Sequence, residues 1–313
     1  MRCLRTLNHL AVVFLVIPML LQACQQESLE PVPTSIIFQP SATTVATLSI
    51  TATVPPATET PLPSATLTQP LEKQVEMALI EGVNWYVGIE SADGEKLFAR
   101  NTEESFFPSS LNNIPIAMVV LKILEYRGDS IEDIHAYGIG QNFNTLLERM
   151  VVENDPAATD TLVEFAEAYD RLRNYLNWWG LKHTFFYPRR TTVEDQLLAL
   201  SQIDSGDLLN ETFSNYLLQL MGIEAENEER HLSTLKEVLP ECDFYNKSGT
   251  MGIPMTTPTV ISETGVLKCG EQSWYIVIAG TPADPLVALE DIQASIEQFG
   301  LVFGNYLRQV ILR

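Results

Sequence analysis

The chain has 313 residues, 46% of them hydrophobic, with 19 Lys and Arg residues against 40 Asp and Glu residues and a formal net charge of −21. Nucleic acid is not an expected partner, because its binding rests on the neutralisation of phosphates by basic side chains. Direct adhesion to anionic lipid is disfavoured on the same ground. The length is enough for one domain with a sizeable core, with room for two lobes.

The N-terminus has the pattern of a secretion signal. Arg2 and Arg5 precede an apolar run over Ala11–Leu21, and Cys24 follows a small residue. The run is shorter than the about 20 residues that a transmembrane helix needs. A cysteine at this point resembles the lipobox of bacterial lipoproteins, which implies that residues 1–23 are removed and that Cys24 is lipidated. An ordinary signal peptide that leaves Cys24 as a free thiol is the alternative.

Residues 24–72 are predicted to be a disordered tether. From residue 25 onward they contain 8 prolines, 10 threonines and no Lys or Arg, a composition that cannot bury enough surface to offset the entropy of ordering. Two acyl chains on Cys24 would give stable anchoring. The folded part is therefore expected to work outside the cytoplasm, lipid-anchored to a bacterial membrane. Without residues 1–23 the chain keeps 17 basic and 40 acidic residues, a net charge of −23.

Residues 73–313 contain the elements of one folded domain. A helix over Val75–Ile80 comes first, and alternation over Asn84–Glu90 and Lys96–Arg100 around the turn Ala92-Asp93-Gly94 predicts a β-hairpin. Apolar residues at helical spacing then predict a series of helices, over Leu111–Tyr126, Gln141–Val152, Asp155 through Phe165, Thr192–Ile203 and Glu211–Met221. Three strands and a long last helix follow, over Asp243–Ser248, Val260–Lys268, Trp274–Ala279 and Pro285–Val310.

This order of elements predicts an α+β fold. The chain ends would share an antiparallel sheet covered by the N- and C-terminal helices, and the middle would form a helical lobe. Cys242 and Cys269 form an even pair in an exported domain, at the start of one strand and the end of the next, which favours a disulfide over two separate thiols. Cys and His residues show no metal-ligand spacing, and no metal or cofactor is expected; the isolated histidines are His135, His183 and His231.

The segment Phe107–Ile116 places a serine where a helix begins. The hydroxyl of Ser110 would feel the unpaired N–H groups and the positive end of the helix, which favour a developing negative charge. A simple helix cap by Ser110 or by Ser109 is the alternative, and on this stretch alone the cap is favoured.

Two further stretches change that weighing, Glu153-Asn154-Asp155 between two helices and Lys247-Ser248-Gly249 on a late strand. Together with Ser110, their order and setting resemble the class A β-lactamases and their penicillin-binding relatives. That family has a serine nucleophile three residues before a lysine, an S-D-N turn between two helices and a K-[ST]-G strand facing the serine. The resemblance covers essentially all of residues 73–313 and implies the β-lactamase/transpeptidase-like fold.

Three departures from the family pattern bear on activity. Asn113 stands where the family has lysine, and an amide cannot take a proton at neutral pH. Glu153 stands where the family has its proton-shuttling serine. The segment 183–191 holds no carboxylate, whereas the β-lactamases carry there the glutamate that activates the deacylating water. Because a positioned base is worth about 10²–10⁴ in rate, the resemblance implies a very slow hydrolase at best.

The resemblance implies Ser110 as the nucleophile and Lys247 as the anchor for a substrate carboxylate. The backbone N–H groups of Ser110 and Thr250 would form the oxyanion site. Glu153 is a candidate replacement base, and a Glu153–Lys247 salt bridge that fills the old site is the favoured alternative. The remaining expected substrate-binding residues are Ser248, Gly249, Asp155 and Asn113.

Two functions stay open on the sequence. The first is an exported acyl-transfer hydrolase for β-lactam or cell-wall peptide (peptidoglycan) amides, catalytically impaired. The second is a non-catalytic binding module for a cell-wall peptide or a protein partner. The aromatic residues of Trp178-Trp179 and Phe185–Tyr187 could stack on sugar or peptide, with core packing as the favoured alternative. The sequence predicts no oligomeric state.

Overall fold

The computed structural model describes residues 70–132, 140–167, 171–223, 230–251 and 260–311. The predicted signal, Cys24, nearly all of the tether and His135 lie outside these residues. Within the described part of the chain, no helix combines the length and the apolar character needed to cross a membrane.

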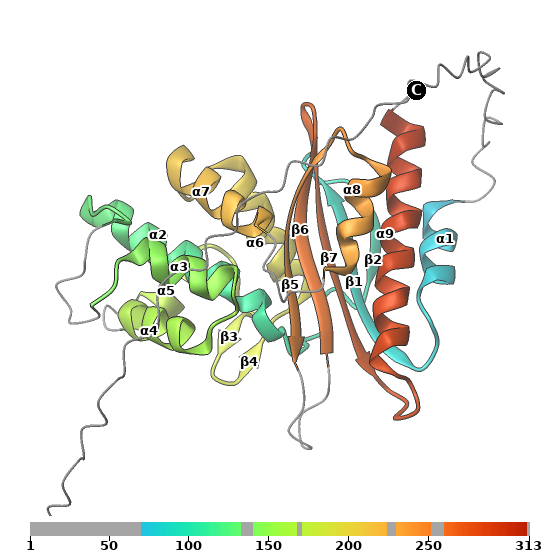
Figure 1. The fold of residues 1–313 in the computed structure, drawn as a ribbon, viewed down its shortest axis with the longest axis horizontal. Coiled ribbons are helices and arrows are strands. Elements are labelled where there is room, and N and C mark those ends of the chain that lie inside the picture. Colours follow the sequence, from blue (N-terminus) through green and yellow to red (C-terminus); the bar gives the residue numbers. More distant parts are fainter. Residues whose placement is uncertain (1–69, 133–139, 168–170, 224–229, 252–259, 312–313) are drawn as a thin grey trace, which may run out of the picture. The chain divides into compact units, whose positions relative to one another are not determined.

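An antiparallel sheet of five strands lies at the centre of the described domain (Figure 1). The strand order is β2-β1-β7-β6-β5, so the early hairpin and the three late strands share one sheet, as the sequence predicts. The strands are β1 Val83–Ser91, β2 Lys96–Arg100, β5 Asp243–Met251, β6 Val260–Cys269 and β7 Gln272–Pro282. The late strands are longer than predicted, because ladder pairing extends them into residues whose side chains show no clear alternation.

Cys242 and Cys269 form a disulfide, which confirms the prediction. In the antiparallel pair of β5 and β6, Asp243 lies opposite Lys268. The flanking cysteines therefore lie side by side, with 4.5 Å between their Cα atoms. The bridge fixes one end of β5, the strand that carries Lys247.

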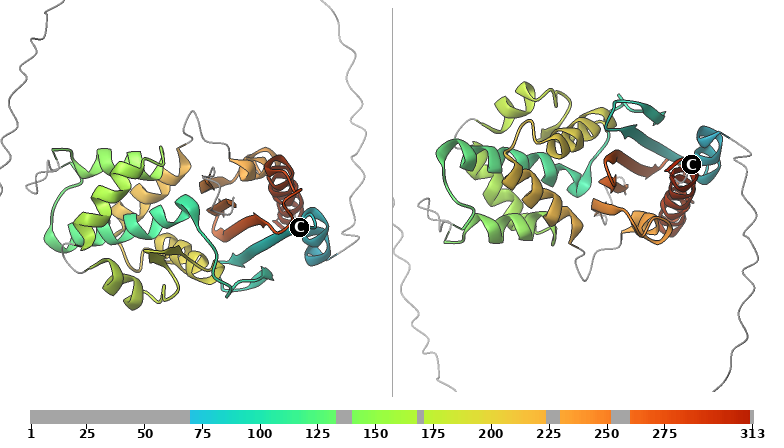
Figure 2. Two further views of the ribbon diagram at one scale, coloured as in Figure 1. Left: turned by 90° about the horizontal axis from the view of Figure 1, so that it is seen from below. Right: turned by 90° about the horizontal axis from the view of Figure 1, so that it is seen from above.

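Helices from both ends of the domain cover one face of the sheet, as predicted (Figures 1 and 2). The layer consists of α1 Leu71–Ala78, the 3-10 helix η2 His231–Ser233, α8 Thr234–Val238 and α9 Leu289–Ile311. α1 and α8 both pack against α9. The apolar core between this layer and the sheet includes Trp85 of β1 with Phe299 and Phe303 of α9.

The middle of the chain forms a helical lobe on the other face of the sheet (Figure 1). Its helices are α2 Asn113–Arg127, α3 Phe143–Val151, α4 Pro156–Glu167, α5 Leu172–Trp178, α6 Val193–Ser205 and α7 Glu211–Gly222. α2 is buried on nearly all sides, as expected of a helix at the centre of a lobe. α6 contacts β1 and β7, and α7 contacts β5.

Short polar side chains begin several of these helices. Asn142, Thr192 and Asn210 each accept a hydrogen bond from a backbone N–H in the first turn of α3, α6 and α7, which satisfies a donor that has no partner inside the helix. α2 ends at Gly128, whose φ of 71° suits a left-handed C-cap. These caps explain why the ends of the predicted helices lie close to the observed ones.

Several short elements were not predicted from the sequence. They include α5, η2, α8 and a hairpin of β3 Phe185–Phe186 and β4 Arg189–Arg190. Each is too short to show a hydrophobic period of its own. The overall class is α+β, as predicted.

Candidate active site

Ser110 lies where the helical lobe meets the sheet. It belongs to a 3-10 turn, η1 (Ser109–Asn112), that leads directly into α2 and contacts β5 and β6. Ser109 has a φ of 51°, in the left-handed region that residues other than glycine rarely adopt. Such backbone strain is concentrated at functional sites. Ser109 is 3% exposed, whereas Ser110 is partly exposed, so Ser110 is the serine that a ligand reaches.

Gly249 of β5 packs directly against the backbone of Ser110. A Cβ atom on Gly249 would lie 2.8 Å from the Ser110 backbone N and 3.1 Å from the Ser109 Cβ, so a side chain at this position would clash. Ser262 Oγ on β6 donates toward the carbonyl groups of Gly249 (3.1 Å) and Pro108 (3.3 Å). The structure thus brings Ser110 and the Lys247-Ser248-Gly249 strand together, as the sequence predicts.

Lys247 is fully buried on the same strand. It is two residues before Gly249, so the two share one face of β5. Its Nζ donates to the Ser248 carbonyl at 2.7 Å, and a buried ammonium requires such partners. Opposite Lys247, Thr264 has a buried Oγ1 without a hydrogen-bond partner in the described part of the chain. Ser248 is buried and Thr250 is exposed.

Asn113 begins α2, at the lysine position of the family motif, and is 4% exposed. Its Nδ2 donates to the Met150 carbonyl at the end of α3, at 2.7 Å. The side chain therefore ties α2 to α3. The amide group that we expected to bind substrate is thus used in a contact between two helices. Asparagine at this position also provides no basic group beside Ser110.

Glu153 is exposed in the turn after α3. It forms no ion pair with Lys247 among the residues that the structure describes, and Lys247 is fully buried. α3 ends at Val151 and the chain reverses at Asn154, which has a φ of 58°, so Glu153 is left on the outside of the turn. The predicted salt bridge is therefore wrong, and Glu153 is not placed to act as a buried base.

Asp155 is the N-cap of α4, as its position before Pro156 predicts. Its Oδ1 accepts hydrogen bonds from the backbone N–H groups of Ala157 (2.8 Å) and Ala158 (3.4 Å), and its Oδ2 accepts one from Arg149. The hydrogen bond from Arg149 holds the pKa of Asp155 below its usual range. The carboxylate thus holds α3 and α4 together, which is a structural role rather than the predicted contact with substrate.

The hydroxyl of Ser110 has no hydrogen-bond partner within the described residues. A serine nucleophile is normally activated by a base within hydrogen-bond reach. The described surroundings of Ser110 therefore offer no group in place to take its proton.

The segment 183–191 forms the β3–β4 hairpin, and a buried polar network fixes its base. Thr184 Oγ1 lies 2.9 Å from Thr191 Oγ1 and donates to Asp195 Oδ2 at 2.8 Å. The His183 backbone N–H donates to the same carboxylate oxygen. Burial raises the pKa of Asp195. This carboxylate holds the hairpin to α6. Its hydrogen bonds go to His183 and Thr184 at the base of the hairpin, so they do not place it as a substitute for the glutamate that activates the deacylating water.

Asn112 is a residue of this region that the sequence analysis missed. It is 2% exposed, and its Nδ2 donates to the Phe185 carbonyl at 3.0 Å, which links η1 to β3. Its Oδ1 is buried without a hydrogen-bond partner among the described residues. A buried group left unpaired in this way costs about 1–3 kcal/mol, so Oδ1 is a candidate acceptor for a ligand N–H.

A second buried polar cluster, also missed, joins η2 to the sheet. Glu263 is fully buried and accepts hydrogen bonds from the backbone N–H groups of His231 and Leu232 (3.1 Å) and from Asn246 Nδ2 (3.1 Å). Burial raises the pKa of Glu263 to about 7, against the opposing effects of these hydrogen bonds and of Arg230. The cluster explains why His231 is buried and not on the surface.

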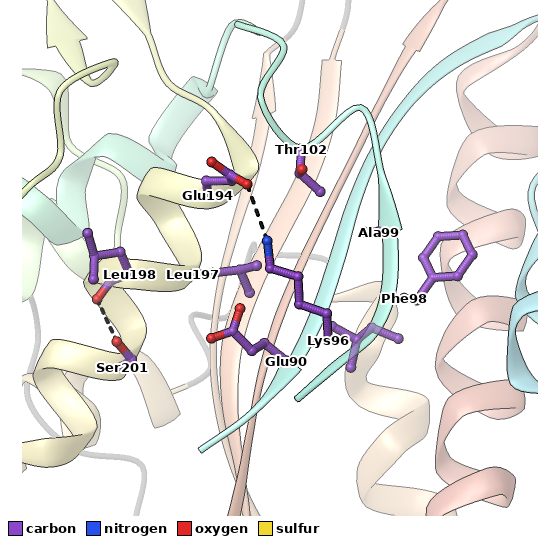
Figure 3. Close-up of a pocket in the computed structure, with 10 residues that line it drawn as sticks. Glu90, Lys96, Phe98, Ala99, Thr102, Glu194, Leu197, Leu198 and Ser201 are labelled. Atoms are coloured by element: carbon purple, nitrogen blue, oxygen red, sulfur yellow. Dashed lines mark hydrogen bonds and ion pairs between the residues drawn. The ribbon is translucent and has the colours of Figure 1, made fainter. Parts of the chain in front are cut away.

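A cavity of about 230 Å³ lies between the β1–β2 hairpin and α6, and none of its lining residues belongs to the predicted site (Figure 3). Lys96 points toward Glu194, and the two form an ion pair of 3.4 Å. Both partners are largely exposed, and such pairs contribute about 0–1 kcal/mol. Within the described ranges, no group of three or more His, Cys, Asp or Glu residues is arranged to hold a metal ion.

Solved structures with the same fold are β-lactamases of low sequence identity. The TLA-1 extended-spectrum β-lactamase is 17% identical with a TM-score of 0.64, and the match covers 76% of this chain and 98% of that one. A β-lactamase from Chitinophaga pinensis is 16% identical (TM-score 0.62, 76% and 97% covered). An ancestral (GNCA) class A β-lactamase is 18% identical (TM-score 0.62, 75% and 99% covered). At these identities the likeness shows the fold.

Comparison with curated proteins gave no match. The sequence model of the Beta-lactamase enzyme family, in contrast, matches residues 70–306, which is most of the chain. With the strained serine turn and the glycine of the K-S-G strand in contact with it, the chain belongs to the Beta-lactamase enzyme family, as a class A β-lactamase-like member.

Proposed function

We propose that this domain is an acyl-transfer site that is acylated slowly through Ser110 and is not efficiently deacylated. The observation that carries the proposal is the contact of Gly249 with the Ser110 backbone N, where a Cβ would lie at only 2.8 Å. This contact supports an oxyanion site formed by the backbone N–H groups of Ser110 and Thr250. Donors of this kind are each worth about 10²–10³ in rate.

In the proposed reaction the Ser110 hydroxyl attacks the carbonyl carbon of an amide. The carbonyl oxygen becomes negative and is stabilised by the two backbone N–H groups. The amide C–N bond then breaks as its nitrogen takes up a proton from water, which leaves a free amine and an ester on Ser110. The buried ammonium of Lys247, which shares a strand face with Gly249, favours a substrate that carries a carboxylate. β-Lactams and cell-wall peptides meet both requirements.

The missing bases make each chemical step slow. Asn113 is tied to Met150, Glu153 is exposed, and the carboxylate of Asp195 holds the hairpin base. The proton of Ser110 must then pass to water, without the gain of about 10²–10⁴ that a positioned base supplies. The acyl-enzyme also needs a base to activate the water that hydrolyses it, so deacylation is expected to be slow as well.

A second candidate function is a binding module without catalysis. The unpaired hydroxyl of Ser110 and the use of Asn113 and Asp155 in structural contacts favour it. Such a module would hold a cell-wall peptide or a protein partner in the same site without forming an ester.

Intact-mass spectrometry of residues 25–313 after incubation with an isotope-labelled penicillin tests the proposal. We expect a stable adduct of one penicillin per chain, mapped to Ser110 and absent from Ser110→Ala. Ser109→Ala is the matched control and should keep the adduct. Rapid hydrolysis without an adduct would mean an efficient enzyme with another base, and neither adduct nor hydrolysis would favour the binding module.

We also propose that the chain is an exported lipoprotein, anchored through Cys24 by a tether up to residue 72. The basic start, the short apolar run and the small residue before Cys24 support this. Expression with labelled palmitate should label the wild-type chain and not Cys24→Ser. Equal labelling of the two would contradict the anchor and leave the proposal for Ser110 untouched.

A further inference from the structure

A row of aromatic and arginine side chains lies on α5 and at the end of α2 and takes no part in the proposed acyl-transfer site. The row consists of Tyr126, Arg171, Tyr175 and Trp178. Tyr126 is 77% exposed and Trp178 is 75% exposed. Large exposed aromatic residues that gather in one place mark interaction sites more often than single exposed ones do. The two helices that carry the row lie in the helical lobe (Figure 1).

The side chains of this row form a continuous chain of contacts. Arg171 Cζ lies 5.7 Å from the ring centroid of Tyr126 and 5.9 Å from that of Tyr175. Tyr175 meets the Trp178 ring edge-on, with 5.8 Å between centroids. Arg171, Tyr175 and Trp178 are spaced so that they lie along one side of α5. The row therefore presents a guanidinium between the exposed ring of Tyr126 and the buried ring of Tyr175, with the exposed ring of Trp178 next to Tyr175.

The row borders a cavity of about 280 Å³, lined by Ile123, Tyr126, Arg127, Arg171 and Tyr175. Tyr175 is buried and stacks on Trp179 at a centroid distance of 5.2 Å. The floor of the cavity is thus rigid before any ligand arrives, which lowers the entropic cost of binding.

The two arginines of the cavity differ in their charge partners. Arg127 forms an ion pair with Asp129 at 2.6 Å. Arg171 forms no ion pair and no side-chain hydrogen bond with any described residue, and its guanidinium lies near the rings of Tyr126 and Tyr175. A planar guanidinium in this setting binds a carboxylate through two parallel hydrogen bonds.

The charge of the whole chain limits the size of such an anion. With a net charge of −21, the protein repels a long polyanion at a distance. A short ligand with one or a few carboxylates is repelled much less, so its pairing with Arg171 has less repulsion to overcome. The exposed rings of Tyr126 and Trp178 add flat apolar surfaces, which match the C–H faces of pyranose rings.

We propose that this row binds a short oligosaccharide that carries carboxylates, an acidic sugar chain of two or three residues. One sugar ring stacks on Trp178 or Tyr126, and a carboxylate pairs with Arg171 over the cavity. The site is separate from Ser110, and the proposal does not depend on acyl transfer.

Isothermal titration of residues 25–313 with trigalacturonic acid tests this proposal, with cellotriose as the neutral trisaccharide. We expect saturable binding of trigalacturonic acid and about tenfold or greater weakening for cellotriose, because the charged hydrogen bonds are lost. Arg171→Gln and Trp178→Ala should each weaken the acidic sugar about tenfold. The matched controls are Arg308→Gln and Leu286→Ala, which remove an exposed arginine and an exposed apolar side chain elsewhere and should leave affinity unchanged.

Equal affinity for the neutral and acidic sugars, or unchanged affinity in both Arg171→Gln and Trp178→Ala, would overturn the proposal. A triglutamate peptide that binds as tightly as trigalacturonic acid would show that carboxylates alone are recognised, and would also overturn it. Because both substituted side chains are at the surface, thermal unfolding should confirm native folding of each variant. Ser110→Ala should bind the acidic sugar like wild type, which separates this site from acyl transfer.

Discussion

At the residue scale, the central feature is that the Ser110 hydroxyl has no basic side chain within hydrogen-bond reach among the described residues. The strained φ of Ser109 and the close approach of Gly249 keep Ser110 in a defined position against β5. The residue three positions on, Asn113, has become a tie between two helices. For the acyl transfer that we propose, the contact of Gly249 with the Ser110 backbone is in place, and no described side chain is placed to take the proton of Ser110.

The role of Asn113 can be separated from catalysis by substitution. Asn113→Ala removes the donor to the buried Met150 carbonyl, so we expect the free energy of unfolding to fall by about 1–3 kcal/mol. The rate of acylation by penicillin should stay within about threefold of wild type, because no proton passes through the amide. Urea unfolding and intact-mass kinetics measure the two effects. Asn177→Ala, on an exposed side chain, is the control, and a large loss of acylation in Asn113→Ala would show that the amide is catalytic.

Glu263 gives a prediction about pH. Its pKa is about 7 in the folded protein, above its ordinary value of about 4.3, so the folded state binds this proton more tightly than the unfolded chain does. The contribution of protonated Glu263 to the free energy of unfolding is therefore complete at pH values below the unfolded pKa. This contribution is lost as pH rises through about 7. The loss is on the order of 3 kcal/mol.

Urea unfolding at a series of pH values between 4 and 8 checks this effect. Glu263→Gln should flatten the decline of stability with rising pH, while Glu290→Gln, on the exposed surface, should leave it as in wild type. A decline of the same size that persists in Glu263→Gln would show that Glu263 is not its source and would contradict the prediction.

At the element scale, strong periodicity and caps were predictable and short connections were not. The β1–β2 hairpin, the three late strands and the caps at Thr192 and Asp155 all carry local signals. α5 and the β3–β4 hairpin carry none, because their geometry is set by contacts from distant residues such as Asn112 and Asp195. The same limit explains the error at Glu153. Its direction depends on the turn at Asn154, which the spacing of motifs does not determine.

The disulfide gives a test at this scale. It joins Cys242 and Cys269 across a sequence separation of 27 residues, and closing a loop of this size is worth about 3 kcal/mol. Cys242→Ser with Cys269→Ser should therefore lower the free energy of unfolding by about that amount, measured in urea. The rate of acylation of folded protein should be unchanged, since Lys247 and Gly249 are held by the ladder with β6 as well. A loss of stability well below 1 kcal/mol would contradict this assignment.

At the scale of the whole molecule, the fold agrees with the family and several side chains of the site depart from the family pattern. The sheet, the lobe and the contact of η1 with β5 agree with the family, while Asn113, Glu153 and Asp195 are not placed as bases beside Ser110. Family membership therefore does not establish turnover, because function depends on the site rather than on the fold. The resemblance in sequence was enough to predict the sheet and the meeting of Ser110 with Lys247-Ser248-Gly249. It was not enough to predict the structural contacts of Asn113 and Asp155.

The lifetime of the penicillin adduct on Ser110 shows whether any group acts as a base at this serine. After free penicillin is removed, intact mass is followed with time at neutral pH. We expect an adduct that persists for hours, because no described side chain is placed to activate the deacylating water. An adduct that disappears within seconds with release of hydrolysed penicillin would show that a base acts at Ser110, and would contradict the proposed slow deacylation.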